Sequence, residues 1–415
     1  MVIFYCDLQK RNHLGTSSTH VFGVLNGLSQ LGHKIIFLNT DHPKTEVEVD
    51  ASPGLSLWGR IKNNIIHWRI IRLLGGEITI FWLFSRSVYV LFKAFIILLK
   101  NGKDIDVIYR RHTLFNSEYL LARMFNIPLI KEVNGLIADE TKISGLGNKV
   151  SIQIIDLIER SNMPRADKII VVTSRLKEIL QTDYRVPADK IVVVQNGANT
   201  DLFKPMGMLE ARRELNLNPA GRYVCFVGRL WPLQRVDCLI KSVPLIIQDF
   251  PDTKFLILGD GETKPSLISL ARQTGISDVI DFTGMVPHQK VPLYVNASNI
   301  CIILEEYNFR SARTGSSPLK LYEYMACAKP VVTSGIPGSD EDVIKSGSGF
   351  VVDTSNIEEL SGAIKKLLGD EQLRKTMGEK GRVAAVEKHN WGKVADQVSM
   401  IFRSTLQEKD YNLTH

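Results

Sequence analysis

YVCFVGRLWPLQRVDCLIKSVPLIIQDFPDTKFLILG, residues 223–259, begins and ends with a short apolar run that is typical of a buried β-strand. The longer segment between the two runs has the pattern of a helix. A strand, a helix and a second strand in this order predict two parallel strands joined by a right-handed crossover. This unit therefore predicts the architecture of the region around it.

The same alternation continues along most of the chain. The remaining strand-like runs are VIFYC, KIIFLN, DVIYR, PLIKEV, KIIVV and KIVVV in the first half, and VIDFTG, NICIILE, KPVVTS and GFVVD in the second. Repeated strand–helix–strand units predict parallel sheets covered by helices. Because 415 residues exceed what one hydrophobic core usually holds, we predict an α/β protein with two Rossmann-like, doubly wound domains.

The boundary between the domains is predicted in the polar stretch 195–205, which contains the turn Asn196-Gly197 and ends at Pro205. The N-terminal domain should span residues 1–195 and the C-terminal domain residues 196–385. Residues 386–415 should form a C-terminal helix that packs back toward the N-terminal domain, followed by a tail. Helices are expected at 356–383 and 387–407, and the polar residues 408–415 should fray.

The composition is that of a folded globular protein, with 44% apolar and 23% charged residues. The five cysteines are odd in number, scattered and mostly set in apolar runs, which indicates neither a disulfide framework nor a zinc site. The N-terminus lacks the pattern of a signal peptide. We therefore predict a cytoplasmic protein without a bound metal.

Most of the net charge of +7 lies between residues 58 and 100, where seven basic residues accompany one acidic residue. The basic residues alternate with large apolar ones and belong to no nucleic-acid-binding module, so nucleic acid is not an expected partner. Within this insert, Thr79, Arg86, Lys93 and Lys100 are seven residues apart and should form a narrow polar stripe on an apolar helix.

The insert favours contact with an anionic membrane, at the inner face, where it would present a lipid-linked acceptor. The segment 78–99 is long enough to span a bilayer, but Arg86 and Lys93 interrupt it. A buried core helix or a dimer face would give the same pattern. These alternatives remain open at the level of sequence.

Candidate binding groups follow the ends of predicted strands, where doubly wound sheets bind ligands. The first strand leads into a loop with Gly15, and the helix after it contains His20. Backbone donors there could meet a phosphate, although a tight turn explains the glycine equally well. Arg229 follows VCFVG and could neutralise a diphosphate or form a structural salt bridge. Backbone groups of residues 284–286, Gly284, Met285 and Val286, could contact a nucleobase.

The most informative stretch is SSPLKLYE, residues 316–323, in which a Gly/Ser loop with Ser317 leads into a helix near Pro318. The free N–H groups of Leu319 and Lys320 would then point at an anion, and Lys320 would add a positive charge. Glu323 lies on the same face and could accept two ribose hydroxyls. Alone it would be an ordinary capping or surface glutamate.

These residues resemble the family-four retaining glycosyltransferases of GT-B fold. The segments ADKIIVVTSRLKEIL, IVVVQNGANTDLFKP, VGRL, FLILGDGE, FTGMVP and SPLKLYEYMACAKPVVTS occur in the order and spacing of that family. The resemblance implies two Rossmann-like domains that face each other across a cleft with a nucleotide-sugar donor between them. It implies that Arg229 binds the diphosphate and Glu323 the ribose, both as catalytic residues. It further assigns the phosphate to the amides of 319–320, the base to 284–286, and an approach to the phosphate to Gly15. Gln234 and Ser317 are also expected among the residues that bind the nucleotide sugar.

Three positions depart from the family pattern. Many relatives have a lysine five residues after the arginine, where this chain has Gln234, and often a glutamate eight positions before Glu323, where it has Gly315. Many also have a histidine in the loop that contains Asn134 in KEVNG here. The candidates on the acceptor side are therefore His20, Glu132 and Asn134, and none of them is assigned the proton transfer.

The resemblance implies a metal-independent, retaining transfer of a sugar from a nucleotide-diphosphate donor to a hydroxyl acceptor. The acceptor would be lipid-linked or saccharide, in the assembly of cell-surface polysaccharide or glycolipid, and no cofactor is expected beyond the donor. A sugar-nucleotide epimerase of the same fold and a non-catalytic sugar-nucleotide-binding subunit remain alternatives.

Overall fold

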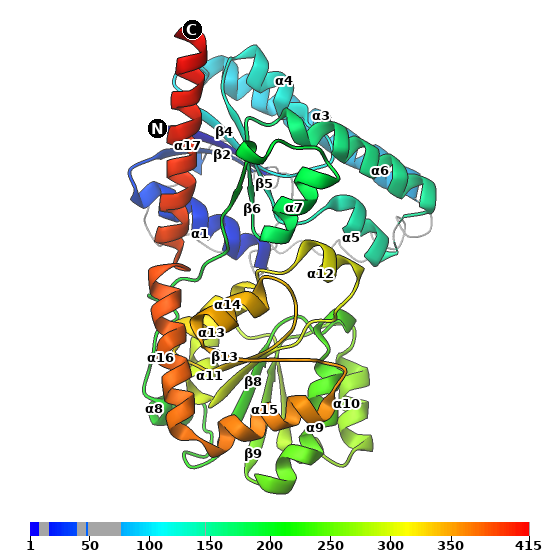
Figure 1. Cartoon of the computed structure of the whole chain (residues 1–415), viewed down its shortest axis with the longest axis vertical. Coiled ribbons are helices and arrows are strands. Elements are labelled where there is room, and N and C mark those ends of the chain that lie inside the picture. Colours follow the sequence, from blue (N-terminus) through cyan, green and yellow to red (C-terminus); the bar gives the residue numbers. More distant parts are fainter. Residues whose placement is uncertain (8–15, 40–46, 49–75, 146, 415) are drawn as a thin grey trace. The chain divides into compact units, whose positions relative to one another are not determined.

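The computed structural model describes residues 1–7, 16–39, 47–48, 76–145 and 147–414 (Figure 1). It contains two compact units, Met1–Val194 with Ala395–His415, and Gln195–Val394. The predicted boundary after residue 195 lies one residue from the observed one. The predicted C-terminal segment begins too early, because residues near 390 are held in the second unit by Ala198. The Ala198 amide donates to the carbonyl of His389 (2.7 Å), and its carbonyl accepts from Trp391 (3.3 Å).

The first unit has a seven-stranded sheet in the order β3-β2-β1-β4-β5-β6-β7. Its strands are β1 (Val2–Asp7), β2 (Lys34–Asn39), β3 (Val47–Glu48), β4 (Val107–Arg111), β5 (Leu129–Val133), β6 (Lys168–Val171) and β7 (Ile191–Val193). All pairs are parallel except β2 with β3. The six strands predicted for this half are confirmed. The two-residue β3 was not predicted, because two residues are too few to show a periodic pattern.

The described helices of this unit are α1 (Thr16–Gln30), α3 (Gly76–Asn101), α4 (Ser117–Met124), α5 (Ile137–Ser144), α6 (Lys149–Asn162), α7 (Ser174–Thr182) and α17 (Trp391–Thr414), which begins in the second unit. Short 3-10 turns lie at Met163–Arg165 and Ala188–Lys190. Helix α3 packs Val90, Ala94 and Leu98 into the core with Phe4 and Ile108. One side of this predicted insert is thus a core helix.

Helix α17 packs on the first unit. The ring of Phe402 is fully buried, 5.2 Å from the ring of Tyr109, and Ser399 Oγ lies 2.8 Å from His33 Nε2. The prediction that residues 408–415 fray was wrong, because α17 continues to Thr414. Glu408 in this last part of the helix forms an ion pair of 2.8 Å with Lys168, which ties it to the sheet.

The second unit has a six-stranded, fully parallel sheet in the order β10-β9-β8-β11-β12-β13. The strands are β8 (Arg222–Val227), β9 (Thr253–Leu258), β10 (Ile280–Gly284), β11 (Ile300–Ile303), β12 (Val331–Ser334) and β13 (Gly349–Val352). All six were predicted. The chain builds outward from β8 to β10 and then returns to place β11 on the other side of β8. The strand order therefore reverses between β8 and β11, and ligands of such sheets bind at the carboxyl ends beside this switch point.

The helices of the second unit are α8 (Met208–Glu214), α9 (Val236–Asp249), α10 (Lys264–Gln273), α11 (Val291–Ala297), α12 (Phe309–Thr314), α13 (Leu319–Ala326), α14 (Ser339–Ser346), α15 (Ile357–Gly369) and α16 (Glu371–Glu387). Short 3-10 turns span Pro232–Gln234, Ser277–Val279 and His288–Lys290. The helix predicted at 356–383 is two helices. Asp370 interrupts it with an extended backbone and caps α16, accepting from the amide of Leu373 (2.8 Å).

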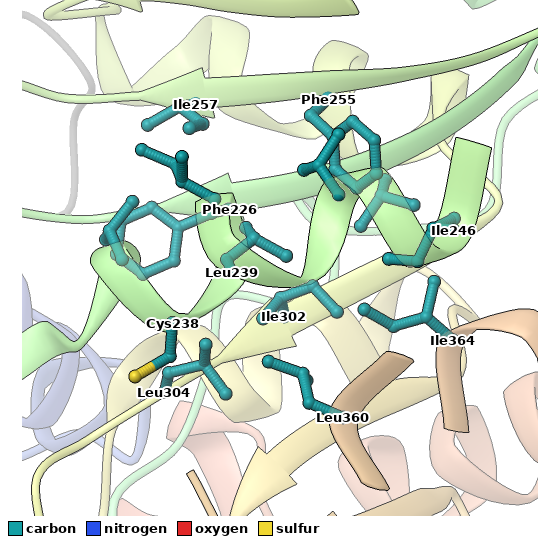
Figure 2. Close-up of a cluster of buried hydrophobic side chains, with 14 of the residues drawn as sticks. Phe226, Cys238, Leu239, Ile246, Phe255, Ile257, Ile302, Leu304, Leu360 and Ile364 are labelled. Carbon is teal, nitrogen blue, oxygen red and sulfur yellow. The ribbon is translucent and has the colours of Figure 1, made fainter. Parts of the chain in front are cut away.

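One face of this sheet carries a large apolar core, shown in Figure 2. Phe226 and Ile302 from the strands meet Leu239 from α9 and Leu360 and Ile364 from α15, and all five side chains are buried. Strands buried on both faces read as continuous apolar runs rather than alternating ones. This core fixes β8 and β11, and with them the loops at the switch point.

Candidate functional site

The loops after β8 and β9 approach each other closely at the carboxyl edge of the second sheet. The amide of Gly228 donates to the carbonyl of Leu258 (2.9 Å), and the amide of Leu230 to that of Asp260 (2.9 Å). Gly259 has φ of +135°, and a Cβ added there would lie 1.9 Å from the Gly228 carbonyl oxygen. Only glycine permits this approach, which fixes the backbone of the loop that carries Arg229.

Arg229 is exposed, and its guanidinium lies 5.5 Å from the centre of the Trp231 ring. In the part of the chain that the structure describes, no carboxylate forms an ion pair with it. The structural salt bridge considered from the sequence is therefore not found among these residues. An arginine without an internal counter-ion at a switch point can bind phosphate oxygens through its planar fork.

The start of α13 is the second feature of this edge that favours an anion. Pro318 precedes the helix with an extended backbone, and no side chain caps this end. The first amides of the helix, those of Leu319 and Lys320, thus lie at the positive end of the helix dipole without a side-chain cap, an arrangement that favours an anion. Ser317, in the loop before the helix, has hydrogen-bond partners within the chain, and its contact with a donor stays a prediction. Its hydroxyl lies 2.9 Å from the Tyr322 hydroxyl and accepts from the amide of Asn196 (3.2 Å), so it holds the loop in place.

Lys320 extends from α13 to the end of β8. Its ammonium donates a hydrogen bond to the side-chain oxygen of Gln234 and lies 4.8 Å from the centre of the Phe226 ring. Burial lowers the pKa of Lys320 to about 8, against the opposing effect of Glu305 and Glu323. Two residues predicted separately, Gln234 and Lys320, are thus in direct contact.

Glu323 lies in the second turn of α13 and is buried, with an exposed fraction of 7%. Its Oε1 is 2.9 Å from His288 Nε2, and the His288 ring packs 5.2 Å from the ring of Phe203. A buried, paired glutamate is not the capping or surface residue of the alternative interpretation. His288 was not predicted as a site residue, although it directly follows the GMVP segment that was expected near the base.

Residues 284–286, which were expected near the base, lie at the end of β10 and directly after it. Gly284 has φ of +74°, and its carbonyl accepts from the amide of Gly259 (2.8 Å). Met285 is exposed, whereas Val286 packs on the core. Residues 284–286 therefore share the carboxyl edge with the loop after β9, and their contact with a base stays a prediction.

Two family models match the chain. Residues 17–202 match the model described as Glycosyltransferase Family 4, and residues 208–384 match Glycosyl transferases group 1. The D-inositol 3-phosphate glycosyltransferase of Corynebacterium aurimucosum is 27% identical over 313 residues, which are 73% of this chain and 72% of that protein. The chain belongs to the group 1 glycosyltransferases of GT-B fold.

Solved structures agree with the fold of this glycosyltransferase. Sucrose-phosphate synthase from Thermosynechococcus elongatus matches with a TM-score of 0.73 at 18% identity, over 98% of this chain and all of that one. HepE of Anabaena, solved in complex with UDP-glucose, matches with a TM-score of 0.68 at 16% identity, over 97% of this chain and all of that one. At these identities the likeness shows the fold alone.

In the first unit of the glycosyltransferase, the three acceptor-side candidates form one network. Glu132 Oε1 lies 2.7 Å from His20 Nε2 and accepts from Asn134 Nδ2 (2.8 Å), while Tyr109 donates its hydroxyl to the other oxygen. Burial by itself would raise the pKa of Glu132, but the His20 charge and hydrogen bond, with help from Arg111 and Tyr109, lower it to about 2. Glu132 is thus a buried anion that orients His20.

Tyr109 was not predicted, because its contact with Glu132 joins two neighbouring strands and leaves no local pattern in the sequence. Gly15, residues 58–75 and the side chain of Arg86 lie outside the described residues. Gly315, the position where the resemblance led us to expect a glutamate, ends α12 with φ of +69°. A glutamate would be strained in that backbone conformation, so the departure has a local cause.

The His288–Glu323 pair should make the stability of the glycosyltransferase depend on pH. The hydrogen bond to Glu323 raises the pKa of His288 above 6.5. A pKa that is higher in the folded than in the unfolded protein stabilises the fold at pH values below the unfolded-state pKa. This contribution is lost as the pH rises through the folded-state pKa. We expect Glu323→Gln to reduce the free energy of unfolding more at pH 5.5 than at pH 9, measured by urea denaturation, and to lower the His288 pKa in an NMR titration. An equal loss of unfolding free energy at both pH values would contradict a pH-dependent contribution from the His288–Glu323 pair.

Proposed function

We propose that this glycosyltransferase moves a sugar from a nucleotide-diphosphate donor to a hydroxyl acceptor, with retention of the anomeric configuration and without a metal ion. One observation carries the proposal: Arg229, without a counter-ion in the described chain, and the uncapped start of α13 both lie at the carboxyl edge of the second sheet. Buried Glu323 lies one turn along the same helix. HepE, of the same fold, binds UDP-glucose, which supports a donor of this class.

The proposed chemistry depends on stabilising the leaving group. As the bond between the sugar and the diphosphate breaks, negative charge grows on the diphosphate, where Arg229 and the amides of α13 would meet it. Glu323, oriented by His288, would hold the ribose. The departing phosphate oxygen would take the proton of the incoming hydroxyl on the same face of the sugar, which gives retention. In this proposal, cations of the chain and the helix dipole supply the charge that a metal ion supplies in other enzymes.

Incubation with a panel of nucleotide sugars, with and without a saccharide or lipid-linked acceptor, tests this function. Glycosyl transfer predicts a new glycoside only when both donor and acceptor are present. An epimerase would convert a donor without acceptor, and a binding subunit would give no product while still raising the melting temperature with the nucleotide. Either of the last two results would contradict the proposal.

We further propose that the first unit docks on an anionic membrane, where it would meet a lipid-linked acceptor of cell-surface polysaccharide or glycolipid assembly. Helices α3 and α6 are in contact, and both expose large apolar side chains. These exposed residues are Val88, Tyr89, Phe92, Ile96 and Leu99 on α3, and Val150, Ile154 and Leu157 on α6. Lys100 and Lys149 are exposed on the same helices and could contact anionic headgroups. In the described part of the chain, no helix has the length and apolarity of a membrane span.

The exposed apolar residues give a direct test of docking. Phe92→Asp and Leu157→Asp should each lower binding to phosphatidylglycerol vesicles by about tenfold or more, because burying such a side chain contributes about 1.5–3 kcal/mol. Vesicle flotation measures the bound fraction. Ile344→Asp in the second unit is the matched control, since Ile344 is as exposed as Leu157, at 67% and 68%. No wild-type flotation, or an equal loss in the control, would contradict docking through α3 and α6.

A further inference from the structure

The ammonium of Lys320 contacts only uncharged groups of the described chain. The side chain extends from the first turn of α13 to the end of β8, where its ammonium meets the side-chain oxygen of Gln234 and the face of Phe226. Both partners are uncharged. In the described part of the chain, no carboxylate lies within ion-pair distance of this ammonium. A partly buried cation held by a neutral amide and an aromatic face is a ready counter-charge for an anion.

The backbone at the end of β8 lies against this ammonium. A Cβ added to Gly228 would be 3.4 Å from Lys320 Nζ and 3.5 Å from Gln234 Oε1. Gly228 immediately precedes Arg229, and the uncapped amides of α13 begin one residue before Lys320. The ammonium therefore lies against the backbone that leads into Arg229, and it belongs to the first turn of the helix whose amides are uncapped.

We propose that Lys320 is the second side-chain cation for the donor diphosphate and that Gln234 is the positioning residue that holds its ammonium at the end of β8. The inference rests on the proposed donor site and deepens it. The positive charge comes from α13 and reaches the end of β8, since the Lys320 ammonium is hydrogen-bonded to the Gln234 side chain.

Protonation provides a signature that a purely structural lysine would not give. Burial lowers the pKa of Lys320 to about 8, although Glu305 and Glu323 act in the opposite direction. An anion bound beside the ammonium would raise this pKa again. At pH 8, where about half of the free lysine is protonated, diphosphate binding should therefore take up as much as about half a proton.

Calorimetric titration with UDP, GDP and ADP, in two buffers of different ionisation enthalpy, tests the proposal. For the diphosphate that the wild type binds best, Lys320→Gln should weaken binding about 10- to 100-fold, the usual effect of losing a hydrogen bond to a charged group. Binding of the corresponding nucleoside should not change. Lys320→Arg should retain affinity within a few-fold but take up no proton from this position, because arginine is charged throughout.

The exchange variant Gln234→Lys/Lys320→Gln tests the role of Gln234, and it should bind the diphosphate at least several-fold more tightly than Lys320→Gln. Thermal melts establish that each variant is folded. Unchanged diphosphate affinity in Lys320→Gln, or proton uptake that persists in Lys320→Arg, would overturn the proposal while leaving the donor site intact. A wild type that binds none of the three diphosphates would instead contradict the proposed function.

Discussion

Arg229→Ala should lower turnover by about 100-fold or more while leaving the protein folded. The guanidinium would meet charge that develops on the leaving diphosphate, and a preorganised donor at such a position commonly contributes about 2.7–4 kcal/mol to the barrier. Because Arg229 is exposed and forms no ion pair within the described chain, its removal should leave no buried charge behind. Single-turnover rates at saturating donor would measure the effect.

Arg272→Ala is the matched control for this experiment. Arg272 is also an exposed arginine of the second unit, near the end of α10, and its loss should leave turnover unchanged. Arg229→Lys should recover only part of the rate, because an ammonium keeps the charge but loses the two-pronged geometry. Wild-type turnover in Arg229→Ala would remove this residue from the mechanism.

Phe226→Ala should be the most destabilising single change among those considered, at about 3–5 kcal/mol of unfolding free energy. Phe226 is fully buried in the core of the second sheet and also lies beneath the ammonium of Lys320. The truncation would leave a cavity that neighbouring strands and helices cannot fill completely. Urea denaturation followed by tryptophan fluorescence would measure the loss.

Tyr307→Ala provides the comparison, since it truncates an aromatic residue of the same unit that is 65% exposed. Surface changes of this kind usually alter stability by no more than about 0.5 kcal/mol. Equal losses in the two variants would show that the cluster in Figure 2 does not carry the stability of this unit.

The sequence was sufficient to predict the architecture because buried parallel strands appear as continuous apolar runs. Every strand of the second sheet was predicted for this reason. The wrong predictions of helix bounds arose where a single side-chain contact decides whether a helix ends or continues. Asp370 divides a long helical pattern by capping α16, and the ion pair of Glu408 holds a polar tail in α17.

The candidate site was predictable to the extent that it follows strand ends. Arg229 could be chosen because it follows a strand end, and Glu323 because it follows the start of a helix at the same edge of the sheet, where ligands of such folds bind. The contacts between site residues could not be predicted, since contacts between distant segments leave no local pattern in the sequence. His288 is 35 residues from Glu323, and Gln234 is 86 residues from Lys320. The network of Tyr109 and Glu132 was hidden for the same reason.

The anomeric configuration of the product tests the central claim most directly. The enzyme would be incubated in EDTA with its nucleotide-sugar donor and acceptor, and the new glycosidic bond would be assigned by NMR from the coupling of the anomeric proton. Leaving-group stabilisation by Arg229 and the start of α13 predicts turnover in EDTA with the configuration of the donor retained. An inverted product, or turnover that requires an added divalent metal ion, would contradict the account.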